Sequence, residues 1–312
     1  MTVLITGGAG FIGSHLAEAL LDAGRRVVVV DDLSTGAQAN IAHLVGREDF
    51  QFVRESVRNR EVMTVLMDRC DVVYHLAGIA GLDDASTRPV ETVRQNVMGT
   101  VHLLDECVAA SVKRFVYAST IYVYSEKGGF YRCSKQAAET YIHEYHRRHA
   151  LNYTILRFGT LYGPRADKRN SVWRYLYQAL RENRIIGGGT GEELREYIHV
   201  RDAARLSVQV LGEEYSNQQV TITGHHPIKY RQLLEMIKEM LGGRVEIIFD
   251  NVENEDHYSL TPYSYTPKIG HKLISNFYVD MGQGLLECIQ EVEGLISSDA
   301  HEKIVAIDDT DR

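Results

Sequence analysis

The chain has 312 residues, of which 44% are hydrophobic and 24% charged, and its formal net charge is −8. This composition is typical of a globular protein with a sizeable core, built as one large domain or two smaller ones. The negative charge argues against a nucleic-acid partner or an anionic membrane surface. We find neither a signal-peptide pattern nor an apolar run that could span a bilayer. Four scattered cysteines predict reduced thiols in a cytoplasmic protein.

The first predicted element is a buried strand over residues 2–6, followed directly by a glycine-rich segment, 7–13. Apolar residues at helical spacing continue from 12 to 23. A strand, a glycine turn and a helix together can hold a pyrophosphate at the helix N-terminus, although glycines also make ordinary turns. A second apolar run, 27–30, ends in Asp31-Asp32, and a carboxylate there binds a ribose 2′-hydroxyl and repels a 2′-phosphate. The segment therefore predicts a dinucleotide site that favours NAD over NADP.

Strands and helices alternate along the next part of the chain. Strands are predicted over 50–53, 72–76, 115–118 and 153–156, and helices over 61–69, 90–110 and 134–149. This order predicts an α/β fold, a Rossmann-type doubly wound parallel sheet. The regularity ends after Gly163-Pro164. Later elements are a helix capped by Asp202 and ending near 211, a strand over 220–222 and a helix over 230–241.

These elements predict two domains. Residues 1–163 and 196–223 are expected to form the NAD-binding Rossmann domain. Residues 164–195 and 224–296 are expected to form a smaller C-terminal α/β substrate-binding portion. The acidic stretch 297–312 is predicted to be a flexible tail.

Tyr131 and Lys135 carry the clearest chemical signal outside the glycine segment. They are four residues apart at the start of a predicted helix, so both side chains lie on one face. A free tyrosine has a pKa of about 10 and is a poor base, but a nearby ammonium or a cationic nicotinamide favours the phenolate. A surface aromatic next to an exposed charge would show the same spacing. The catalytic interpretation is favoured because the pair follows the strand 115–118, at the edge where such sheets bind ligands.

These motifs together resemble the extended short-chain dehydrogenases/reductases, and within them the nucleotide-sugar epimerases and dehydratases such as the UDP-glucose 4-epimerases. The resemblance runs from Thr2 to about Glu291. The matching segments are Thr6–Gly13, Asp31-Asp32-Leu33, His75-Leu76-Ala77-Gly78, Asn96–Thr100, Ser119–Tyr124, the Tyr131/Lys135 pair, Arg157–Pro164, Arg195 and Thr266–Gly270.

The resemblance implies NAD as cofactor, a nucleotide-sugar substrate and a homodimer formed through the helices near 100–110 and 134–149. It implies Thr120, Tyr131 and Lys135 as catalytic residues. The cofactor-binding residues that it implies are Gly7, Gly10, Phe11, Ile12, Gly13, Asp31, Asp32, Leu33, Ser56, Val57, Leu76, Ala77, Gly78, Asn96, Ser119, Tyr131, Lys135 and Phe158. The substrate-binding residues that it implies are Thr120, Tyr131, Thr160 and Arg195.

The chain departs from the family pattern at four places. Ser56 stands where relatives have an Asp that contacts adenine, and Thr160 stands where they have an Asn near the sugar diphosphate. A second phosphate-binding arginine has no counterpart in Asn251–Asp256. The connection from Thr120 to Tyr131 is also shorter than in relatives, where this loop borders the sugar pocket. These departures bear on the choice of sugar more than on hydride chemistry.

Related reactions differ in the residues that follow Thr120. The resemblance implies an Asp-Glu pair there in 4,6-dehydratases and a Glu in nucleotide-sugar decarboxylases. Ile121 and Tyr122 cannot transfer a proton in those roles. A 4-epimerase needs only the Thr, Tyr and Lys set with NAD, so the sequence predicts an NAD-dependent nucleotide-sugar 4-epimerase with a UDP-hexose-type substrate. A 4-ketoreductase or 4-oxidase uses the same residues and is the alternative. A dehydratase or a non-catalytic NAD-binding regulator is less favoured.

The histidines do not predict a metal site. His225-His226 and the histidines at 143, 146 and 149 could be taken for ligands. The latter three follow a polar helix face, and no carboxylate or cysteine completes a set at zinc-type spacing. The sequence therefore predicts no metal.

Overall fold

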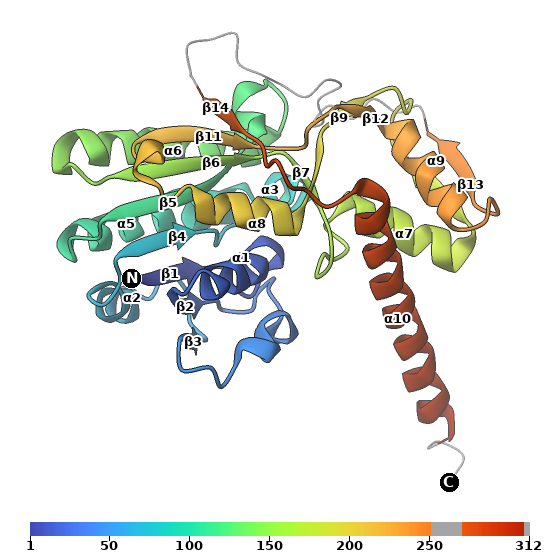
Figure 1. Ribbon diagram of the computed structural model, residues 1–312, viewed down its shortest axis with the longest axis horizontal. Coiled ribbons are helices and arrows are strands. Elements are labelled where there is room, and N and C mark those ends of the chain that lie inside the picture. Colours follow the sequence, from blue (N-terminus) through green and yellow to red (C-terminus); the bar gives the residue numbers. More distant parts are fainter. Residues whose placement is uncertain (251–269, 309–312) are drawn as a thin grey trace.

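The computed structural model describes residues 1–250 and 270–308, and side chains up to residue 298. Within these residues, eight strands form one parallel sheet in the order β3-β2-β1-β4-β5-β6-β11-β14 (Figure 1). Their bounds are β1 Thr2–Thr6, β2 Arg26–Val30, β3 Phe50–Val53, β4 Val72–His75, β5 Arg114–Thr120, β6 Tyr153–Phe158, β11 Gln218–Ile222 and β14 His271–Leu273. Because β1 lies inside the sheet between β2 and β4, the predicted doubly wound sheet is confirmed.

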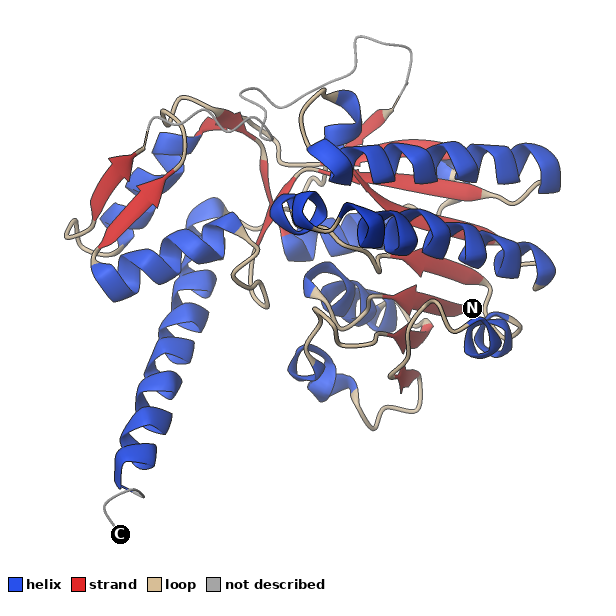
Figure 2. Ribbon diagram, turned by 180° about the vertical axis from the view of Figure 1, so that it is seen from behind, coloured by secondary structure: helices blue, strands red, loops and turns tan. Residues whose placement is uncertain are grey.

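The central strands are short apolar runs because helices cover both faces of the sheet. Helices α1 Phe11–Asp22 and α8 Val200–Gln209 lie on one face. Helices α2 Arg60–Met67, α5 Gly99–Ala109 and α6 Gly129–His149 lie on the other, as the opposite views in Figures 1 and 2 show. Each face has its own buried core, in which the helices pack on alternate side chains of the strands.

The predicted helix over 90–110 is divided into three pieces. These are α4 Pro89–Thr92, a π-helical turn η2 Val93–Met98, and α5. Such turns concentrate at functional sites, and this one contains the predicted cofactor residue Asn96. Shorter helical segments are η1 Gln38–Leu44, α3 Leu82–Thr87, η3 Ile121–Tyr124 and η4 Glu213–Tyr215.

The smaller portion has a separate hydrophobic core. Its helices are α7 Ser171–Glu182, α9 Tyr230–Met240 and α10 Met281–Asp308. Among the residues that the structure describes, three short strand pairs lie outside the main sheet: β7 Thr160–Tyr162 with β10 Tyr197–His199, β9 Leu194–Arg195 with β12 Ile228–Lys229, and β8 Arg184–Gly187 with β13 Glu246–Phe249. Helix α10 projects from the body of the molecule and continues through most of the segment expected to be a flexible tail (Figure 1).

Two local predictions need correction. Asp202 does not cap α8, because the side chain of His199 accepts the hydrogen bond from the Arg201 amide, at 3.3 Å. Asp202 lies in the first turn, where its carboxylate accepts a hydrogen bond from the Val279 amide at 2.8 Å. In addition, β14 joins the main sheet beside β11, although its residues fall in the range expected to belong to the smaller portion. A search of the described helices found none with the length and apolar character of a membrane span.

Candidate active site

The glycine turn between β1 and α1 is held by contacts between backbone segments. The Gly7 amide donates to the Val30 carbonyl at 2.8 Å, which joins the turn to β2. A Cβ added to Gly7 would lie 2.7 Å from the Ala77 nitrogen, and one added to Gly13 would overlap the Gly7 carbonyl oxygen. Gly7 also has a φ of +72°, which favours glycine. The turn therefore leaves no room for side chains at these positions, and it places backbone directly before α1.

Asp31 binds the same turn from the end of β2. Its Oδ2 accepts a hydrogen bond from the Ala9 amide and its Oδ1 accepts one from the Leu33 amide, both at 2.9 Å. Burial raises the pKa of Asp31, the two amides oppose this rise, and the neighbouring Asp32 adds to it. The exposed Asp32 accepts a hydrogen bond from the Ser34 amide at 2.9 Å. Asp31 is thus fixed beside the glycine turn, as the ribose-binding prediction requires.

The end of β4 meets the π-helical turn η2. The Asn96 Oδ1 accepts from the Ile79 amide at 2.8 Å, and its Nδ2 donates to the Ile79 carbonyl and to the Ser134 Oγ, both at 2.9 Å. A Cβ on Gly78 would lie 2.9 Å from the Asn96 Oδ1. Asn96 therefore ties Ile79, directly after the segment Leu76–Gly78, to helix α6, which carries the predicted catalytic pair.

The remaining predicted cofactor residues lie along the same edge of the sheet. Ser56 and Val57 follow β3, where the Ser56 Oγ accepts from the Arg58 amide at 3.3 Å and Val57 is buried. Phe158 ends β6, is buried, and pairs in register with Thr120 on β5. The predicted residues thus follow five neighbouring parallel strands, β3, β2, β1, β4 and β5, with Phe158 on the next.

The structure brings Thr120, Tyr131 and Lys135 together at the end of β5 and the start of α6. Thr120 is 5% exposed and forms a side-chain hydrogen bond with Tyr131. The Lys135 Nζ donates to the Ala118 carbonyl at 2.7 Å and lies 4.7 Å from the centre of the Tyr117 ring. It is 5.9 Å from the centre of the Tyr131 ring. The group has the members of a proton-transfer site, with one hydroxyl bonded to another and an ammonium nearby.

The protonation state expected for Tyr131 from its spacing to Lys135 is not found in the chain alone. Burial raises the pKa of Tyr131 to about 12, and its hydrogen bond with Thr120 opposes this only in part. Burial also lowers the pKa of Lys135 to about 8. The expectation that a nearby ammonium and a bound nicotinamide favour the phenolate concerns the protein with NAD and stays a prediction. In the chain alone, the removal of the phenol from water sets the direction of the pKa shift.

The short connection from Thr120 to Tyr131 folds back against α6. The Gln136 Nε2 donates to the Val123 carbonyl and the Arg132 Nη1 donates to the Ser125 carbonyl, both at 3.0 Å. The Tyr122 ring stands edge-on to the Tyr131 ring, with centroids 6.4 Å apart. Side chains of α6 therefore bond two carbonyls of the connection, and an aromatic ring stands beside the predicted base.

Thr160 and Arg195 lie outside the main sheet. Thr160 pairs with Tyr197 between β7 and β10, and Arg195 pairs with Ile228 between β9 and β12. Both strand pairs stand where the chain passes between the sheet and the smaller portion. The stretch Asn251–Asp256 and the motif residues Thr266–Ile269 lie outside the described residues.

The sequence did not reveal the charged pair beneath these residues. Glu139 on α6 and Arg157 on β6 are 2% and 0% exposed, and the Arg157 Nη2 lies 2.7 Å from the Glu139 Oε2. The Ser119 Oγ donates to the Glu139 Oε1 at 2.6 Å. The only signal in the sequence is that Glu139 falls one helical turn after Lys135.

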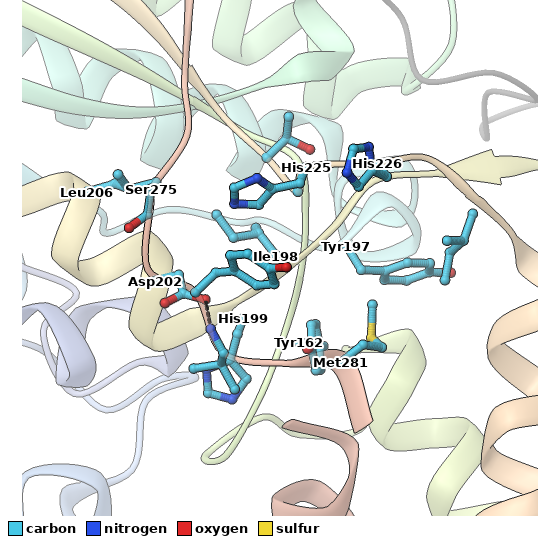
Figure 3. A pocket seen from close by; sticks show the side chains of 15 residues that line it. Tyr162, Tyr197, Ile198, His199, Asp202, Leu206, His225, His226, Ser275 and Met281 are labelled. Atoms are coloured by element: carbon cyan, nitrogen blue, oxygen red, sulfur yellow. Dashed lines mark hydrogen bonds between the residues drawn. The ribbon is translucent and has the colours of Figure 1, made fainter. Parts of the chain in front are cut away.

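A cavity of about 170 Å³ lies near the start of α8 (Figure 3). It is lined by His199 and Asp202, by His225 and by Tyr278, among others, and the rings of His225 and Tyr278 have centroids 4.4 Å apart. Thr120, Tyr131 and Lys135 do not line it. The cavity is thus separate from the predicted catalytic residues.

With this geometry established, comparison with known proteins identifies the family. The sequence model of the NAD dependent epimerase/dehydratase family matches residues 3–223. The chain belongs to this family. The glycine turn at the start of α1, where no Cβ fits, and the fixed Asp31 carboxylate suit the cofactor in the family's name.

Solved structures of this family share the whole fold. The chain is 28% identical to UDP-glucuronic acid 4-epimerase from Bacillus cereus in complex with UDP-glucuronic acid and NAD, with a TM-score of 0.83, and the match covers 95% of this chain and 100% of that one. It is 27% identical to UDP-glucose 4-epimerase from Thermotoga maritima with UDP-glucose, with a TM-score of 0.82 and the same coverage.

The names of the curated relatives describe more than one reaction. The chain is 28% identical over 276 residues to a putative UDP-glucose 4-epimerase from Methanocaldococcus jannaschii, covering 83% of this chain and 88% of that protein. It is also 28% identical over 274 residues to UDP-glucuronic acid decarboxylase 1 from Xenopus tropicalis, covering 81% of this chain and 63% of that protein. The comparisons therefore support a nucleotide-sugar enzyme of this family at a level coarser than a single reaction.

Among the described residues, no group of three or more His, Cys, Asp and Glu side chains could hold a metal ion. Burial lowers the pKa of His199 to about 3. Of the histidines that the sequence offered as ligands, His225 lines the cavity, whereas the His143 Nε2 lies 2.9 Å from the Gln219 Nε2.

Proposed function

We propose that this protein is an NAD-dependent nucleotide-sugar 4-epimerase that acts on a UDP-hexose-type substrate through a transient 4-keto sugar. The observation that carries the proposal is the hydrogen-bonded pair Thr120 and Tyr131 with Lys135 on the same helix face, at the sheet edge that also carries the glycine turn. The 4-epimerases among the solved relatives support it.

Tyr131 acts as the base and acid for the sugar 4-hydroxyl. NAD, when bound, supplies the hydride acceptor and a positive charge that favours the tyrosine phenolate. That charge matters here because burial alone raises the pKa of Tyr131 to about 12. Lys135 adds a second positive charge, while Thr120 holds the proton between the sugar and Tyr131. Hydride leaves one face of the sugar carbon and returns to the other.

Arg195 and Thr160 are proposed to hold the sugar diphosphate. Thr160 lies two residues after Phe158, which pairs with Thr120 on β5, and Arg195 lies on the β9–β12 strand pair. Arg195 supplies a guanidinium, which binds phosphate oxygens with directed hydrogen bonds. Turning of the keto sugar in the pocket then depends on the shortened connection beside Tyr122.

Dehydration and decarboxylation are disfavoured by the residues after Thr120. Ile121 is buried and has no titratable group, and Tyr122 stands edge-on to Tyr131. A 4-oxidase or 4-ketoreductase would use the same three residues and is the second candidate. The two differ in whether the hydride returns to the same sugar.

The deciding experiment incubates the purified protein with a panel of nucleotide sugars, followed by proton NMR of the sugars and by NADH absorbance. An epimerase gives a mixture of two 4-epimers without net NADH. Stoichiometric NADH would assign an oxidase, and a dehydrated or decarboxylated product would reject the proposal.

A homodimer through the helices near 100–110 and 134–149 stays a proposal, supported by exposed apolar side chains on α6 and on α4 and η2, which contact it. Val90, Val93 and Met98 on α4 and η2, and Phe130 and Tyr141 on α6, are between 46% and 64% exposed. Apolar groups gathered on a surface often mark a protein interface. Light scattering at micromolar concentration should give twice the monomer mass, and a monomeric mass would reject the dimer.

The unpaired cysteines are consistent with a cytoplasmic enzyme.

A further inference from the structure

Glu139 forms an unusually complete set of bonds for a buried carboxylate. It is 2% exposed on α6, and its partner Arg157 on β6 is fully buried. The Arg157 Nε donates to the Glu139 Oε1 at 3.0 Å and the Arg157 Nη2 donates to the Oε2 at 2.7 Å. The Ser119 Oγ donates to the same Oε1 at 2.6 Å. One carboxylate therefore joins α6 to β5 and β6.

Arg157 is anchored at its outer nitrogens as well. Its Nη1 donates to the Tyr124 hydroxyl at 2.5 Å, and its Nη2 also contacts the Gln219 Oε1 at 3.2 Å. The guanidinium is thus fixed between η3 and β11, and it cannot move away from Glu139 without breaking these bonds. A buried ion pair is weak evidence for stability, because well-packed apolar residues often serve as well. Fold stability alone therefore does not explain why these two buried side chains are charged.

Glu139 is coupled to two of the three predicted catalytic groups. It follows Lys135 by one helical turn on the same face of α6. It also bonds Ser119, the residue directly before Thr120 in β5. Glu139 is thus placed to act on both the charge of Lys135 and the position of Thr120.

The surroundings of Lys135 make a nearby carboxylate important. On α6 it has Tyr131 and Glu139, on β5 it has Tyr117, and on β4 it has His75. Burial lowers the pKa of His75 to about 3, so this imidazole is neutral and offers no attraction. Burial also lowers the pKa of Lys135 to about 8, and the Glu139 carboxylate opposes that fall. Glu139 is the anionic partner among these four groups.

We propose that Glu139 is a positioning residue, whose carboxylate, anchored by Arg157, keeps the Lys135 ammonium charged and holds Thr120 in register with Tyr131 through Ser119. This role deepens the proposed function. Only the kinetic test of the role depends on that function. The role itself concerns the chain's own groups, and it can be tested without substrate.

The first test is an NMR titration of protein labelled with ¹³C-lysine, in which the Lys135 signal is assigned by its loss in Lys135→Met. Glu139→Gln should lower the Lys135 titration midpoint by about one pH unit, because it removes the carboxylate that opposes the fall in the Lys135 pKa. Glu144→Gln is the matched control, since Glu144 lies on the same helix but is 41% exposed and paired with Arg147 and Arg148. It should leave the midpoint at the wild-type value.

A second variant covers a failure of Glu139→Gln to fold with Arg157 left unpaired. Glu139→Gln/Arg157→Met removes both charges, a change that buried pairs tolerate. It should also lower the midpoint, but by less than Glu139→Gln does, because the Arg157 charge is removed together with the carboxylate. Glu139→Asp keeps the carboxylate and should hold the midpoint near the wild-type value. A Lys135 midpoint equal to wild type in the folded variants lacking the carboxylate would overturn the proposal.

Kinetics separate the two effects of Glu139 once a substrate is known. Glu139→Gln should move the alkaline limb of the kcat profile to lower pH, because Lys135 loses its proton earlier. Ser119→Ala keeps the carboxylate, so it should lower kcat while leaving the Lys135 midpoint unchanged. An unchanged kcat in Ser119→Ala would overturn the part of the proposal that concerns Thr120. If no nucleotide sugar is turned over, the proposed function fails, and the NMR titration still decides the charge role.

Discussion

Two connections at the same edge of the sheet are built in opposite ways. The turn from β1 into the first residues of α1, residues 7–13, is fixed by backbone against backbone, so that a Cβ on Gly7 would lie 2.7 Å from the Ala77 nitrogen. The connection from β5 to α6, residues 121–128, is fixed by side chains, such as Gln136, which donates to the Val123 carbonyl at 3.0 Å.

The two connections should therefore tolerate different substitutions. The first turn admits no added atoms, because backbone cannot move aside. The second should tolerate changes of shape but not changes of charge or hydrogen bonding at its anchors, the buried Glu139 and Arg157. The experiments below test this contrast, from the largest expected effect to the smallest.

The largest effect is expected at Gly13. Gly13→Ala would bring a methyl group 2.6 Å from the Gly8 Cα and into the Gly7 carbonyl oxygen. We expect a loss of about 3 kcal/mol or more in the free energy of unfolding and loss of NAD binding. Thermal unfolding and calorimetric NAD titration measure both.

The control for this substitution is Gly294→Ala on α10. An added Cβ at Gly294 has no neighbour within 4 Å. In a helix the exchange should be neutral or stabilising by up to about 1 kcal/mol. If Gly13→Ala behaved like this control, the first turn would not be limited by backbone contact.

Tyr131→Phe should lower turnover by at least about a hundredfold, the usual size of a general acid–base contribution. NAD affinity should be kept, because the lost hydroxyl bonds Thr120 and not the glycine turn. Tyr141→Phe removes a hydroxyl from an exposed position on the same helix and should leave turnover unchanged. Full activity in Tyr131→Phe would reject the proposed mechanism.

Asp31→Ala should weaken NAD binding by about tenfold or more, since a hydrogen bond to a charged group contributes about 1.5–3 kcal/mol. Asp31 also anchors the Ala9 amide, so the turn should loosen. Asp49→Ala, at an exposed carboxylate paired with Arg47, is the control. Stronger binding of NADP than of NAD by the wild type would contradict the role given to Asp31.

A separate effect, spread over three buried histidines, is a dependence of stability on acid pH. Burial lowers the pKa of His15 to about 4 and those of His75 and His199 to about 3, against 6.5 for a free histidine. Below about pH 6.5 the unfolded chain therefore binds more protons than the folded one, and stability falls as pH decreases. Above that pH these groups are neutral in both states and contribute no slope.

Urea unfolding between about pH 7.5 and 5 measures this slope, up to about 1.4 kcal/mol per pH unit for each histidine at the acid end. His75 is the last residue of β4. Its ring nitrogens lie 2.7 Å from the Thr6 Oγ1 and 3.0 Å from the Thr100 Oγ1. His75→Gln should reduce the slope. A slope of the opposite sign, with stability rising as pH falls, would contradict the buried neutral state.

The sequence by itself determined the parts that depend on neighbouring residues. The strand, glycine turn and helix are contiguous over residues 2–23, so their spacing predicted both the elements and the place of the dinucleotide site. The same holds for Tyr131 and Lys135, because four residues always bring two side chains to one face of a helix. The alternating pattern also predicted the parallel sheet.

Only the tertiary structure decided the contacts between distant segments. Glu139 meets Ser119 across 20 residues and Gln219 meets Arg157 across 62, and no local pattern encodes such pairs. The sign of the Tyr131 pKa shift was likewise decided by burial, which depends on everything packed around the hydroxyl. Spacing along the chain fixes local geometry through the backbone, whereas burial and long-range pairing arise only when separate elements pack together.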